Sequence, residues 1–527
     1  MRTLKANIRK AIPATEGWLE LFLTPAQKEN FAQWEEIIID KSLSGKVKNL
    51  TWMDNICSFF PENISPNVIS LTGLCILAQT WYVILHYGQE WPVLANWISV
   101  ASLLLFYITN GLDAKQSERI RQKTTLNDFF KYSADCCSTV FLSLITAYCL
   151  GVTEYETQWY AVQTSLLVLF TKHLSAFHRN DGLRYALLAG PGEVITFCTV
   201  LLICRGTLGI EWFISLYFHT IRKFFAILAP YNITMSDDLL DYEAIGSELM
   251  KVSYWSIYSV SLVKTLLLPK DKSWSRFGIV ICLLMRMAPA MFVVLGSEIP
   301  NLEPLSVISD GFFMSILISD VMLAKFAGRE IHVLVVLMSS ASLLSHTVIF
   351  SLCLVYYIAV FGDLCHHMNL PLLSVCRNVY CDGVYDLCHI GHKNLFKRAL
   401  TNGNRLFVGV CNDEDCSGYK RPPIMNHAER CAEVEACKAV TKVIPNAPCF
   451  GITQEFLDKH QIHVVACGQE YFDKYPNTDD DPYYGYVRKI GIAKPMQRTA
   501  GMSTSDLIRR IQSAAPADER NDTKKSK

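Results

Sequence analysis

The sequence predicts a polytopic α-helical membrane region of about ten helices, followed by an α/β domain with a parallel sheet. Apolar residues make up 51% of the 527 residues, and charged residues only 19%. Long hydrophobic stretches recur between about residues 67 and 362, and none of membrane length follows residue 370. After residue 377, short β-branched runs alternate with helical stretches, which is the pattern of a parallel sheet.

Nine apolar stretches are candidates for membrane crossing, which takes about 20 mostly apolar residues in a helix. They are residues 67–87, 93–112, 136–153, 159–176, 191–205, 251–268, 275–297, 305–325 and 332–363. The last stretch is too long for one untilted span, and a break near Ser345 and His346 favours two crossings. This brings the expected number of helices to about ten.

Basic residues orient these candidates. Lys or Arg residues follow the second, fourth, sixth and eighth stretches, whereas the connections after the first, third and seventh carry none. By the positive-inside rule, the N-terminus and the basic loops are cytosolic. Two crossings at the end would make the C-terminal region cytosolic as well.

The two ends of the chain differ from the region between them. Residues 1–66 are expected to form a cytosolic preface. Within it, residues 18–23 and Trp34 would either lie along the membrane surface or belong to an ordinary packed helix. Residues 514–527 are polar and lack aromatic residues, so we expect a disordered tail.

Charge and cysteine content exclude some classes of function. Lys and Arg together number 49, as do Asp and Glu, so overall charge predicts no nucleic-acid partner. The 19 cysteines are spread along the chain, and no signal-peptide pattern opens the sequence. We therefore expect reduced thiols rather than a disulfide framework.

Two polar motifs stand out in the C-terminal region. Residues 380–392 (YCDGVYDLCHIGH) follow the first predicted strand and place His389 and His392 in the first turn of a helix, where free backbone N–H groups attract anions. Gly391 lets a ligand approach the backbone. Residues 497–506 (QRTAGMSTSD) begin the last helix with a guanidinium and several hydroxyls, which suits a polyphosphate.

Each motif alone has a simpler explanation. Two histidines in one turn could be a metal pair or a satisfied turn, and Ser-Thr-Ser-Asp is usually a helix N-cap. Together, however, the motifs resemble those of the CTP:phosphocholine and CTP:phosphoethanolamine cytidylyltransferases, and the resemblance covers nearly all of 377–512. It implies a Rossmann-like nucleotidyltransferase domain over 370–513. It also implies attack of a phosphorylated amino-alcohol on the α-phosphate of CTP, with release of pyrophosphate.

The resemblance implies a role for each matching residue. His389, His392, Lys420 and Arg498 would be catalytic, and Asp382, Phe450 and Tyr471 would face the amino-alcohol headgroup. CTP would be bound by Gly383, Val384, Tyr385, Gly391, Thr499, Ser503, Thr504 and Ser505. Mg²⁺ would accompany CTP, and a homodimer is suggested.

The predicted headgroup pocket departs from the family pattern. The choline enzymes carry a Trp after Ala-Pro, whereas Cys449 follows Ala447 and Pro448 here. Aromatic faces attract quaternary ammonium groups, so this change weakens the case for choline. The broader resemblance favours phosphocholine as substrate, and phosphoethanolamine stays open as the alternative.

The membrane region, over about 50–368, resembles the CDP-alcohol phosphotransferases of the choline/ethanolamine type. That family binds two metals with four aspartates, of which only Asp113 and Asp135 match here. Asn110 and Lys131 replace the other two. The resemblance thus implies an inactive domain over 67–368, with at most a remnant cation site, in which Lys131 could pair with the two aspartates.

Three functions stay open on these grounds. The chain could be a cytidylyltransferase anchored in an internal membrane, of the endoplasmic reticulum or Golgi, with its catalytic domain in the cytosol. It could be a bifunctional enzyme that also carries phosphotransferase activity, or a non-catalytic membrane scaffold that binds nucleotide or a lipid-synthesis partner. Membrane lipid is expected among the partners of the chain.

Overall fold

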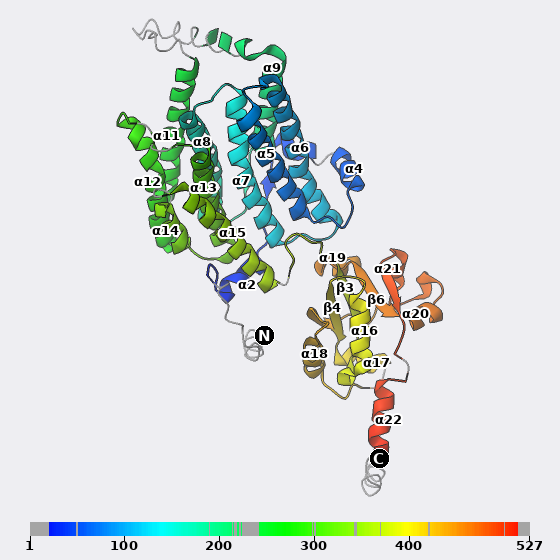
Figure 1. Cartoon of the computed structure of the whole chain (residues 1–527). Coiled ribbons are helices and arrows are strands. Elements are labelled where there is room, and N and C mark those ends of the chain that lie inside the picture. Colours follow the sequence, from blue (N-terminus) through cyan, green and yellow to red (C-terminus); the bar gives the residue numbers. More distant parts are fainter. Residues whose placement is uncertain are drawn as a thin grey trace. The chain divides into compact units, whose positions relative to one another are not determined.

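The computed structural model describes residues 21–48, 51–188, 190–212, 214–215, 219–220, 223, 242–297, 299, 302–341, 345–368, 370–419, 422–499 and 501–514. The chain divides into two units (Figure 1). One comprises Met1–Ser117 and Lys123–Ser374, and the other comprises Glu118–Gln122 and Val375–Lys527. The boundary predicted from the sequence, between residues 368 and 370, lies a few residues earlier.

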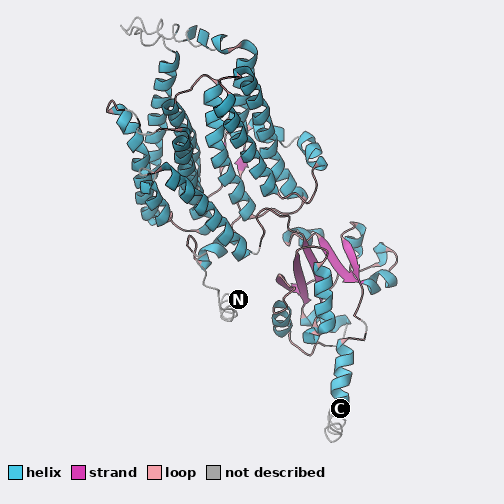
Figure 2. Ribbon diagram, viewed as in Figure 1, coloured by secondary structure: helices cyan, strands magenta, loops and turns pink. Residues whose placement is uncertain are grey.

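The first unit is a bundle of helices, and every apolar stretch of the sequence lies in a helix or a helix pair (Figures 1 and 2). The long helices are α5 (Pro66–Tyr87), α6 (Pro92–Arg119), α7 (Thr125–Cys149), α8 (Tyr155–Arg179), α9 (Pro191–Leu208), α11 (Tyr242–Leu266), α12 (Ser273–Val294), α13 (Pro304–Ala327) and α15 (His346–Met368). The shorter elements are α2 (Pro25–Gln33), α3 (Leu43–Lys48), α4 (Thr51–Phe59), α14 (Val333–Ala341) and the parallel two-residue strands β1 (Ile39–Asp40) and β2 (Arg184–Tyr185).

Six segments of the described chain are both long and apolar enough to cross a membrane. They are α5, α6, α9, α13, α15 and Lys270–Val294, which contains α12. The expected count of about ten spanning helices is therefore not confirmed. Helices α7, α8 and α11 are as long, at 25 residues each, but more polar.

The last apolar stretch breaks where the sequence predicted. Helix α14 ends at Ala341 and α15 begins at His346. With nine residues, α14 is about 14 Å long, less than half of a hydrocarbon core of about 30 Å. Helix α14 alone is therefore too short to cross such a core.

Helices α13 and α15 nevertheless run in parallel. His346 Nδ1 lies 3.9 Å from Asp310 Oδ1, and the Tyr356 hydroxyl donates to Asp320 Oδ1 at 3.1 Å, so both contacts join residues 36 positions apart. Residues 328–345 therefore carry the chain back along α13. This return is the geometry that the two-crossing prediction requires.

The described part of the N-terminal preface packs as an ordinary helix and its neighbours. Phe22 and Leu23 are buried, and the Trp34 ring stacks on Phe326 at 5.7 Å. Lys325 Nζ donates to Glu36 Oε1 at 2.9 Å in a fully buried ion pair. Residues 18–20, for which a surface position was considered, lie outside the described residues, as does the tail from residue 515.

The second unit is built on a parallel five-stranded sheet in the order β5-β4-β3-β6-β7. Its strands are β3 (Asn378–Gly383), β4 (Arg405–Cys411), β5 (Lys442–Ala447), β6 (Val464–Gly468) and β7 (Ala493–Met496). The sequence predicted β3, β4 and β6. It did not predict β5 and β7, each of which contains a proline (Pro445 and Pro495) and lies at an edge of the sheet, where a missing N–H is tolerated.

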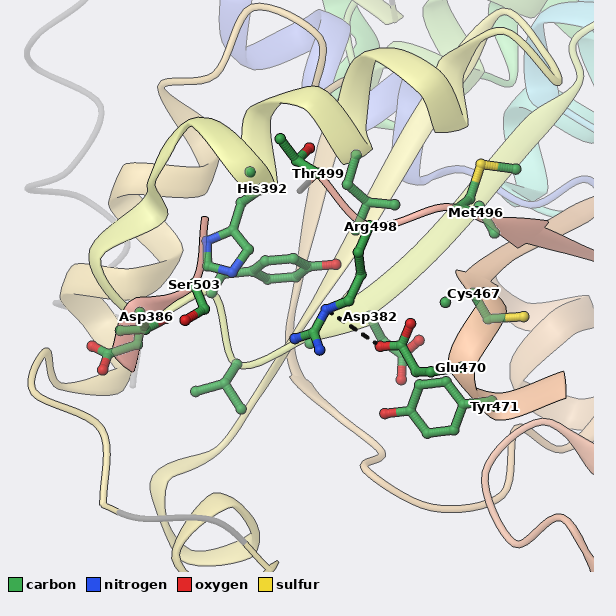
Figure 3. Close-up of a pocket in the computed structure, with 18 of the residues that line it drawn as sticks. Asp382, Asp386, His392, Cys467, Glu470, Tyr471, Met496, Arg498, Thr499 and Ser503 are labelled. Carbon is green, nitrogen blue, oxygen red and sulfur yellow. Dashed lines mark ion pairs between the residues drawn. The ribbon is translucent and has the colours of Figure 1, made fainter. Parts of the chain in front are cut away.

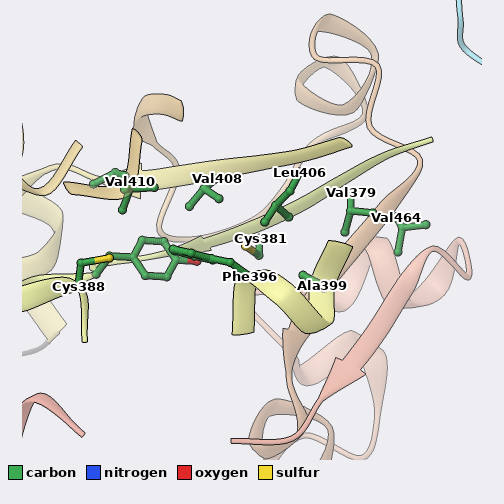
Figure 4. Close-up of a cluster of buried hydrophobic side chains, with 12 residues drawn as sticks. Val379, Cys381, Cys388, Phe396, Ala399, Leu406, Val408, Val410 and Val464 are labelled. Carbon is green, nitrogen blue, oxygen red and sulfur yellow. The ribbon is translucent and has the colours of Figure 1, made fainter. Parts of the chain in front are cut away.

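Helices cover both faces of this sheet. On one face α16 (Ile390–Leu400) and α18 (His427–Glu435) pack on β-branched strand residues, and Phe396, Val408 and Val434 are completely buried there (Figure 4). On the other face lie α19 (Gln454–Lys459) and α21 (Gly485–Lys489), through Leu457 and Val487. Strands with such apolar faces form the buried parallel sheet expected from the sequence.

Strand order fixes where a ligand can bind. From β3 the chain moves outward to β4 and β5, and it then returns to the other side of β3 to form β6 and β7. In open parallel sheets, ligands bind at the carboxyl ends of the strands where the order reverses. Here that point lies between the ends of β3 and β6.

Candidate active site

A cavity of about 330 Å³ lies at the carboxyl ends of β3 and β6, where the strand order predicts it (Figure 3). The sequence-predicted residues that line it are Asp382, Gly383, Val384, Tyr385, His389, Gly391, His392, Tyr471, Arg498, Thr499, Ser503, Thr504 and Ser505. Both motifs therefore meet in one cavity. Phe450 does not line it, and Lys420 lies outside the described residues.

The two histidines stand side by side at the start of α16. Their rings are stacked, with centroids 3.8 Å apart, and His389 is the N-cap residue of the helix. A side chain on Gly391 would approach the His389 ring to 2.9 Å, so glycine keeps the first turn open. The helix N-terminus and both rings thus face the cavity together, as anion binding requires.

The hydrogen bond of His389 fixes its tautomer. The backbone N–H of Gly391 donates to His389 Nδ1 at 3.1 Å, so Nδ1 is unprotonated and Nε2 carries the proton. Burial, assisted by the positive charge of Arg498, lowers the pKa of His389 below its usual value near 6.5. A neutral His389 can therefore donate from Nε2 to a phosphate oxygen.

The second motif brings cationic and hydroxyl groups to the same cavity. Arg498 lies 3.6 Å from Glu470 Oε1 and is 75% exposed, so its guanidinium reaches across the mouth (Figure 3). Ser503 Oγ accepts from Asp506 N at 3.1 Å and donates to Asp506, which is the N-cap arrangement considered from the sequence. Thr504 Oγ1 is 3.4 Å from His389 Nε2, which links the two motifs. The last helix, α22, spans Thr504–Ala514.

Arg430 holds the carboxyl ends of two strands in place. It is completely buried, and it donates to the carbonyl oxygens of Val384 and Cys411 at 2.6 and 2.8 Å. It also donates to Asp413 Oδ1 at 2.6 Å. Nothing in the sequence pattern shows which carbonyl oxygens a buried arginine bonds, so this role of Arg430 comes from the structure alone.

Asp386 fixes the loop that precedes α18. Its buried carboxylate accepts from the backbone N–H groups of Ile424 and Met425 at 3.1 Å. Lys420 belongs to this same connection, a few residues before the anchored point. The side chain of Asp386 thus joins the histidine loop to the segment from which a catalytic lysine was predicted.

Aromatic side chains form the wall beside Asp382. The Tyr484 hydroxyl donates to Asp382 Oδ1 at 2.9 Å, and the Tyr471 ring lies 4.9 Å from that of Tyr484 and 5.1 Å from that of Tyr483. Phe450, which was predicted to face the headgroup, is not among the lining residues: its half-exposed ring stacks on Tyr483, which does line the cavity, at 5.2 Å. Cys449 lines the cavity instead.

Sequence reasoning missed several lining residues. Tyr483 and Tyr484 are the most important of these, together with Glu470, Asp386 and Met502. The aromatic run in residues 482–486 (PYYGY) was the available signal for the two tyrosines. It lies far along the chain from Asp382, so only the fold brings them together.

Asp113 and Asp135, which were predicted as the remnant of a cation site in the helical unit, are bonded by protein groups. Lys131 Nζ donates to Asp113 Oδ1 at 2.5 Å and to the carbonyl oxygen of Asn110 at 2.9 Å. Ser70 donates to the other carboxylate oxygen of Asp113, and Asn110 Nδ2 donates to Asp135 Oδ1 at 2.8 Å. Lys131 therefore holds Asp113, and Asn110 holds Asp135.

Comparison with known proteins assigns the second unit to a type of domain. Residues 380–510 match the model of the cytidylyltransferase-like family. Over 139 residues, the chain is 41% identical to choline-phosphate cytidylyltransferase 2 of Arabidopsis thaliana. The aligned stretch is 25% of this chain and 44% of that protein. Human choline-phosphate cytidylyltransferase A is 40% identical over 135 residues, 25% of this chain and 36% of the relative.

Ethanolamine-phosphate cytidylyltransferase of Mus musculus is 38% identical over 133 residues, which is 25% of this chain and 32% of the relative. The chain thus spans less than half the length of these relatives, and the matches lie in its second unit. The agreement of these matches with the parallel sheet and its cavity leads to one conclusion: the chain carries a C-terminal cytidylyltransferase-like domain.

Proposed function

We propose that this protein transfers the cytidylyl group of CTP to phosphocholine, forming CDP-choline and pyrophosphate for phospholipid synthesis. The observation that carries the proposal is the meeting of His389, His392 and Arg498 in one cavity at the strand-order reversal. Relatives named as choline-phosphate and ethanolamine-phosphate cytidylyltransferases support the reaction class. These names leave the choice of amino-alcohol open.

The reaction needs positioning and charge neutralisation more than covalent chemistry. An oxygen of the substrate phosphate attacks the α-phosphorus of CTP, and the bond to the β-phosphate breaks to release pyrophosphate. The Nε2–H of His389, the imidazole of His392 and the N–H groups at the start of α16 would stabilise the charge on the transferring phosphoryl group. Arg498, Thr499, Ser503, Thr504 and Ser505 would hold the outgoing phosphates.

Mg²⁺ is expected to enter with the nucleotide. Within the described residues no three His, Cys, Asp or Glu side chains are grouped to hold a metal, whereas Asp382 and Glu470 both line the cavity. Mg²⁺ commonly takes one or two carboxylates together with substrate phosphates, so this donor set fits a metal carried by CTP. When bound, the ion would neutralise part of the triphosphate charge.

The wall beside Asp382 supports a trimethylammonium headgroup. Tyr471 and Tyr484 offer ring faces next to a carboxylate, and a cation over such faces gains about 0.5–2 kcal/mol. Cys449 at the cavity is the observation that favours phosphoethanolamine instead, since it removes one aromatic face. We give more weight to the rings of Tyr471 and Tyr484 than to the ring that is missing at Cys449, and therefore choose phosphocholine.

The helical unit would anchor this activity in an internal membrane, of the endoplasmic reticulum or the Golgi, with the catalytic unit in the cytosol. We further propose that it is a CDP-alcohol phosphotransferase-like domain without transferase activity, because Lys131 is paired with Asp113. Homodimerisation through the catalytic unit is part of the same proposal.

The direct test is to measure CDP-alcohol formation by the full chain in detergent micelles, with CTP and either phosphocholine or phosphoethanolamine. We expect turnover with phosphocholine, at a kcat/KM above that for phosphoethanolamine. A chain with no activity on either substrate would overturn the enzymatic proposal, and a tenfold preference for phosphoethanolamine would overturn the choice of substrate.

A further inference from the structure

A buried ion pair lies next to the aromatic wall of the cavity, which is formed by Tyr471, Tyr483 and Tyr484. Arg488 Nη1 lies 2.8 Å from Asp481 Oδ2, and the two side chains are 8% and 0% exposed. Neither residue lines the cavity. Replacing a buried ion pair by apolar groups is often neutral or stabilising, so stability alone is a weak reason for such a pair. Its function must be sought in the groups that it holds.

The carboxylate of Asp481 fixes the backbone of two wall residues. Its Oδ1 accepts from the backbone N–H groups of Tyr483 and Tyr484, each at 3.0 Å, and its Oδ2 accepts from Arg488. The Tyr484 hydroxyl in turn donates to Asp382 Oδ1 at 2.9 Å. One carboxylate thus sets the position of the chain that carries both rings. Through Tyr484 it reaches the acidic group that is expected to face the amino-alcohol.

The guanidinium of Arg488 ties the same turn to the helix that carries the third ring. Nη1 also donates to the carbonyl oxygen of Tyr475 at 2.7 Å, and Nη2 donates to that of Pro476 at 3.4 Å. Both acceptors directly follow α20 (Gln469–Lys474), which contains Tyr471. The two segments of chain that supply the wall are therefore joined by one side chain.

These contacts depend on the shape of arginine as well as on its charge. Arg488 Cζ lies 4.5 Å from the centroid of the Phe472 ring, so the planar group packs on the residue that follows Tyr471 in α20. The planar fork of an arginine can bond several acceptors while its face stacks on a ring. A lysine in its place would keep the positive charge but lose both the fork and the stacked face.

We propose that Asp481 and Arg488 are positioning residues that set the headgroup specificity of the site, by holding Tyr471 and Tyr484 in place beside Asp382. This role rests on the proposed function, because it acts on the wall that would meet the ammonium group. A trimethylammonium group gains only from ring faces that are correctly placed, whereas a primary ammonium can donate hydrogen bonds to a carboxylate instead. Loosening this ion pair should therefore weaken the use of phosphocholine more than that of phosphoethanolamine.

The test compares Arg488→Lys with Lys489→Met in the full chain in detergent micelles. Lys489 is the next residue of α21, and its ion pair with Asp479 at 3.2 Å has side chains that are 67% and 69% exposed, so it is the matched control. Arg488→Lys should raise the KM for phosphocholine about three- to tenfold, and that for phosphoethanolamine less. The KM for CTP should stay unchanged. Lys489→Met should change none of the three values.

The KM values separate positioning from a loss of stability. A variant that is partly unfolded has fewer active molecules, so its kcat falls for both substrates while no KM changes. That result, or equal rises in KM for the two amino-alcohols, would overturn the role in specificity. Unchanged KM values in Arg488→Lys, with turnover by the unmodified chain, would overturn this role alone. An unmodified chain that uses neither amino-alcohol would overturn the proposed function and this role with it.

A second comparison shows whether Arg488 acts through the wall. Tyr471→Leu already removes a ring, so adding Arg488→Lys should raise the KM for phosphocholine by a smaller factor than it does in the unmodified chain. Asp481→Asn keeps the shape of the side chain but weakens its hold on Arg488. It should change the ratio of the two kcat/KM values in the same direction as Arg488→Lys. Equal factors with and without Tyr471→Leu would show that Arg488 does not act through this ring.

Discussion

Lys131 Nζ lies 2.5 Å from Asp113 Oδ1, and this ion pair joins α7 to α6 in the interior of the helical unit. The lysine amine occupies the position where a cation would have to approach the carboxylate. The same lysine also bonds the carbonyl oxygen of Asn110, so it bridges two points of α6. The position predicted for a remnant cation is thus taken by an ammonium group of the chain itself.

The first prediction is that the helical unit binds divalent cations weakly and does not transfer a phospho-alcohol group. Full chain incubated with CDP-choline and diacylglycerol should form no phosphatidylcholine, and Mn²⁺ titrated without CTP should show no tight two-metal site. Lys131→Asp alone should not restore transfer, because Asn110 remains an amide. Transfer by the unmodified chain would show that the domain is an active second enzyme.

The second prediction concerns the stability of this pair. Lys131→Met leaves the Asp113 carboxylate buried without its cation, which should lower the free energy of unfolding by about 3–5 kcal/mol. Lys115→Met is the control. Lys115 Nζ lies 3.1 Å from Asp54 Oδ1, but the Asp54 side chain is half exposed, and such pairs contribute about 0–1 kcal/mol. Thermal unfolding in detergent micelles would compare the two. Equal effects would mean that Lys131 is not the counter-ion that holds α6 and α7 together.

The third prediction is that His392→Ala nearly abolishes nucleotidyl transfer and leaves the fold intact. Losing one contact to the developing charge costs about 3–4 kcal/mol, or a factor of 10²–10³ in kcat. His460→Ala is a suitable control, because that ring packs on Phe456 at the opposite face of the sheet from α16. Near-normal turnover by His392→Ala would remove this histidine from the mechanism.

The fourth prediction follows from the lowered pKa of His389. In the unfolded chain His389 becomes protonated near pH 6.5, whereas in the native protein it stays neutral to lower pH. The free energy of unfolding therefore decreases as pH falls below 6.5. Protonation of Nδ1 would also break its bond from Gly391. We therefore expect kcat/KM to stay level through pH 6.5 and to fall only in more acid solution.

Arg498→Gln tests the cause of that shift. It removes a positive charge near His389, so the pKa of His389 should rise and the acid limb of the pH profile of kcat/KM should move to higher pH. The overall rate will drop as well, but a drop in rate alone does not move the limb. An unmoved limb would show that burial, without Arg498, sets this pKa.

These residues show which features of the site could be predicted from the sequence alone. The histidine turn and the Ser-Thr-Ser segment were placed correctly, because each is a local pattern of caps and turns on the chain. The partners of Asp382 and Glu470 were not predicted, because they depend on the order of the strands. The edge strands were missed for a similar reason, since proline reads as a break until its position at the edge of the sheet is known.

In the helical unit, the sequence could not predict the lengths of the helices or their relative directions. A hydropathy pattern could locate the break at His346, but it could not show that α14 has only nine residues or that α13 and α15 run in parallel. Contacts between Tyr356 and Asp320 decide that direction, and they join residues on different helices. Pairing of this kind carries no signal in a single sequence.

The last prediction tests how the amino-alcohol is chosen. Tyr471 lies between Tyr483 and Tyr484, next to the carboxylate of Asp382, so its ring face is the best placed to meet a trimethylammonium group. Tyr471→Leu keeps an apolar side chain but removes the ring, and it should cost phosphocholine about 0.5–2 kcal/mol of binding. Phosphoethanolamine, whose ammonium can donate hydrogen bonds to Asp382 instead, should lose less. Phe450→Leu is the control, because that ring stacks on Tyr483 without lining the cavity and should change the ratio of the two kcat/KM values little. If Tyr471→Leu lowers both substrates equally, the ring supports the wall of the cavity but does not select the headgroup.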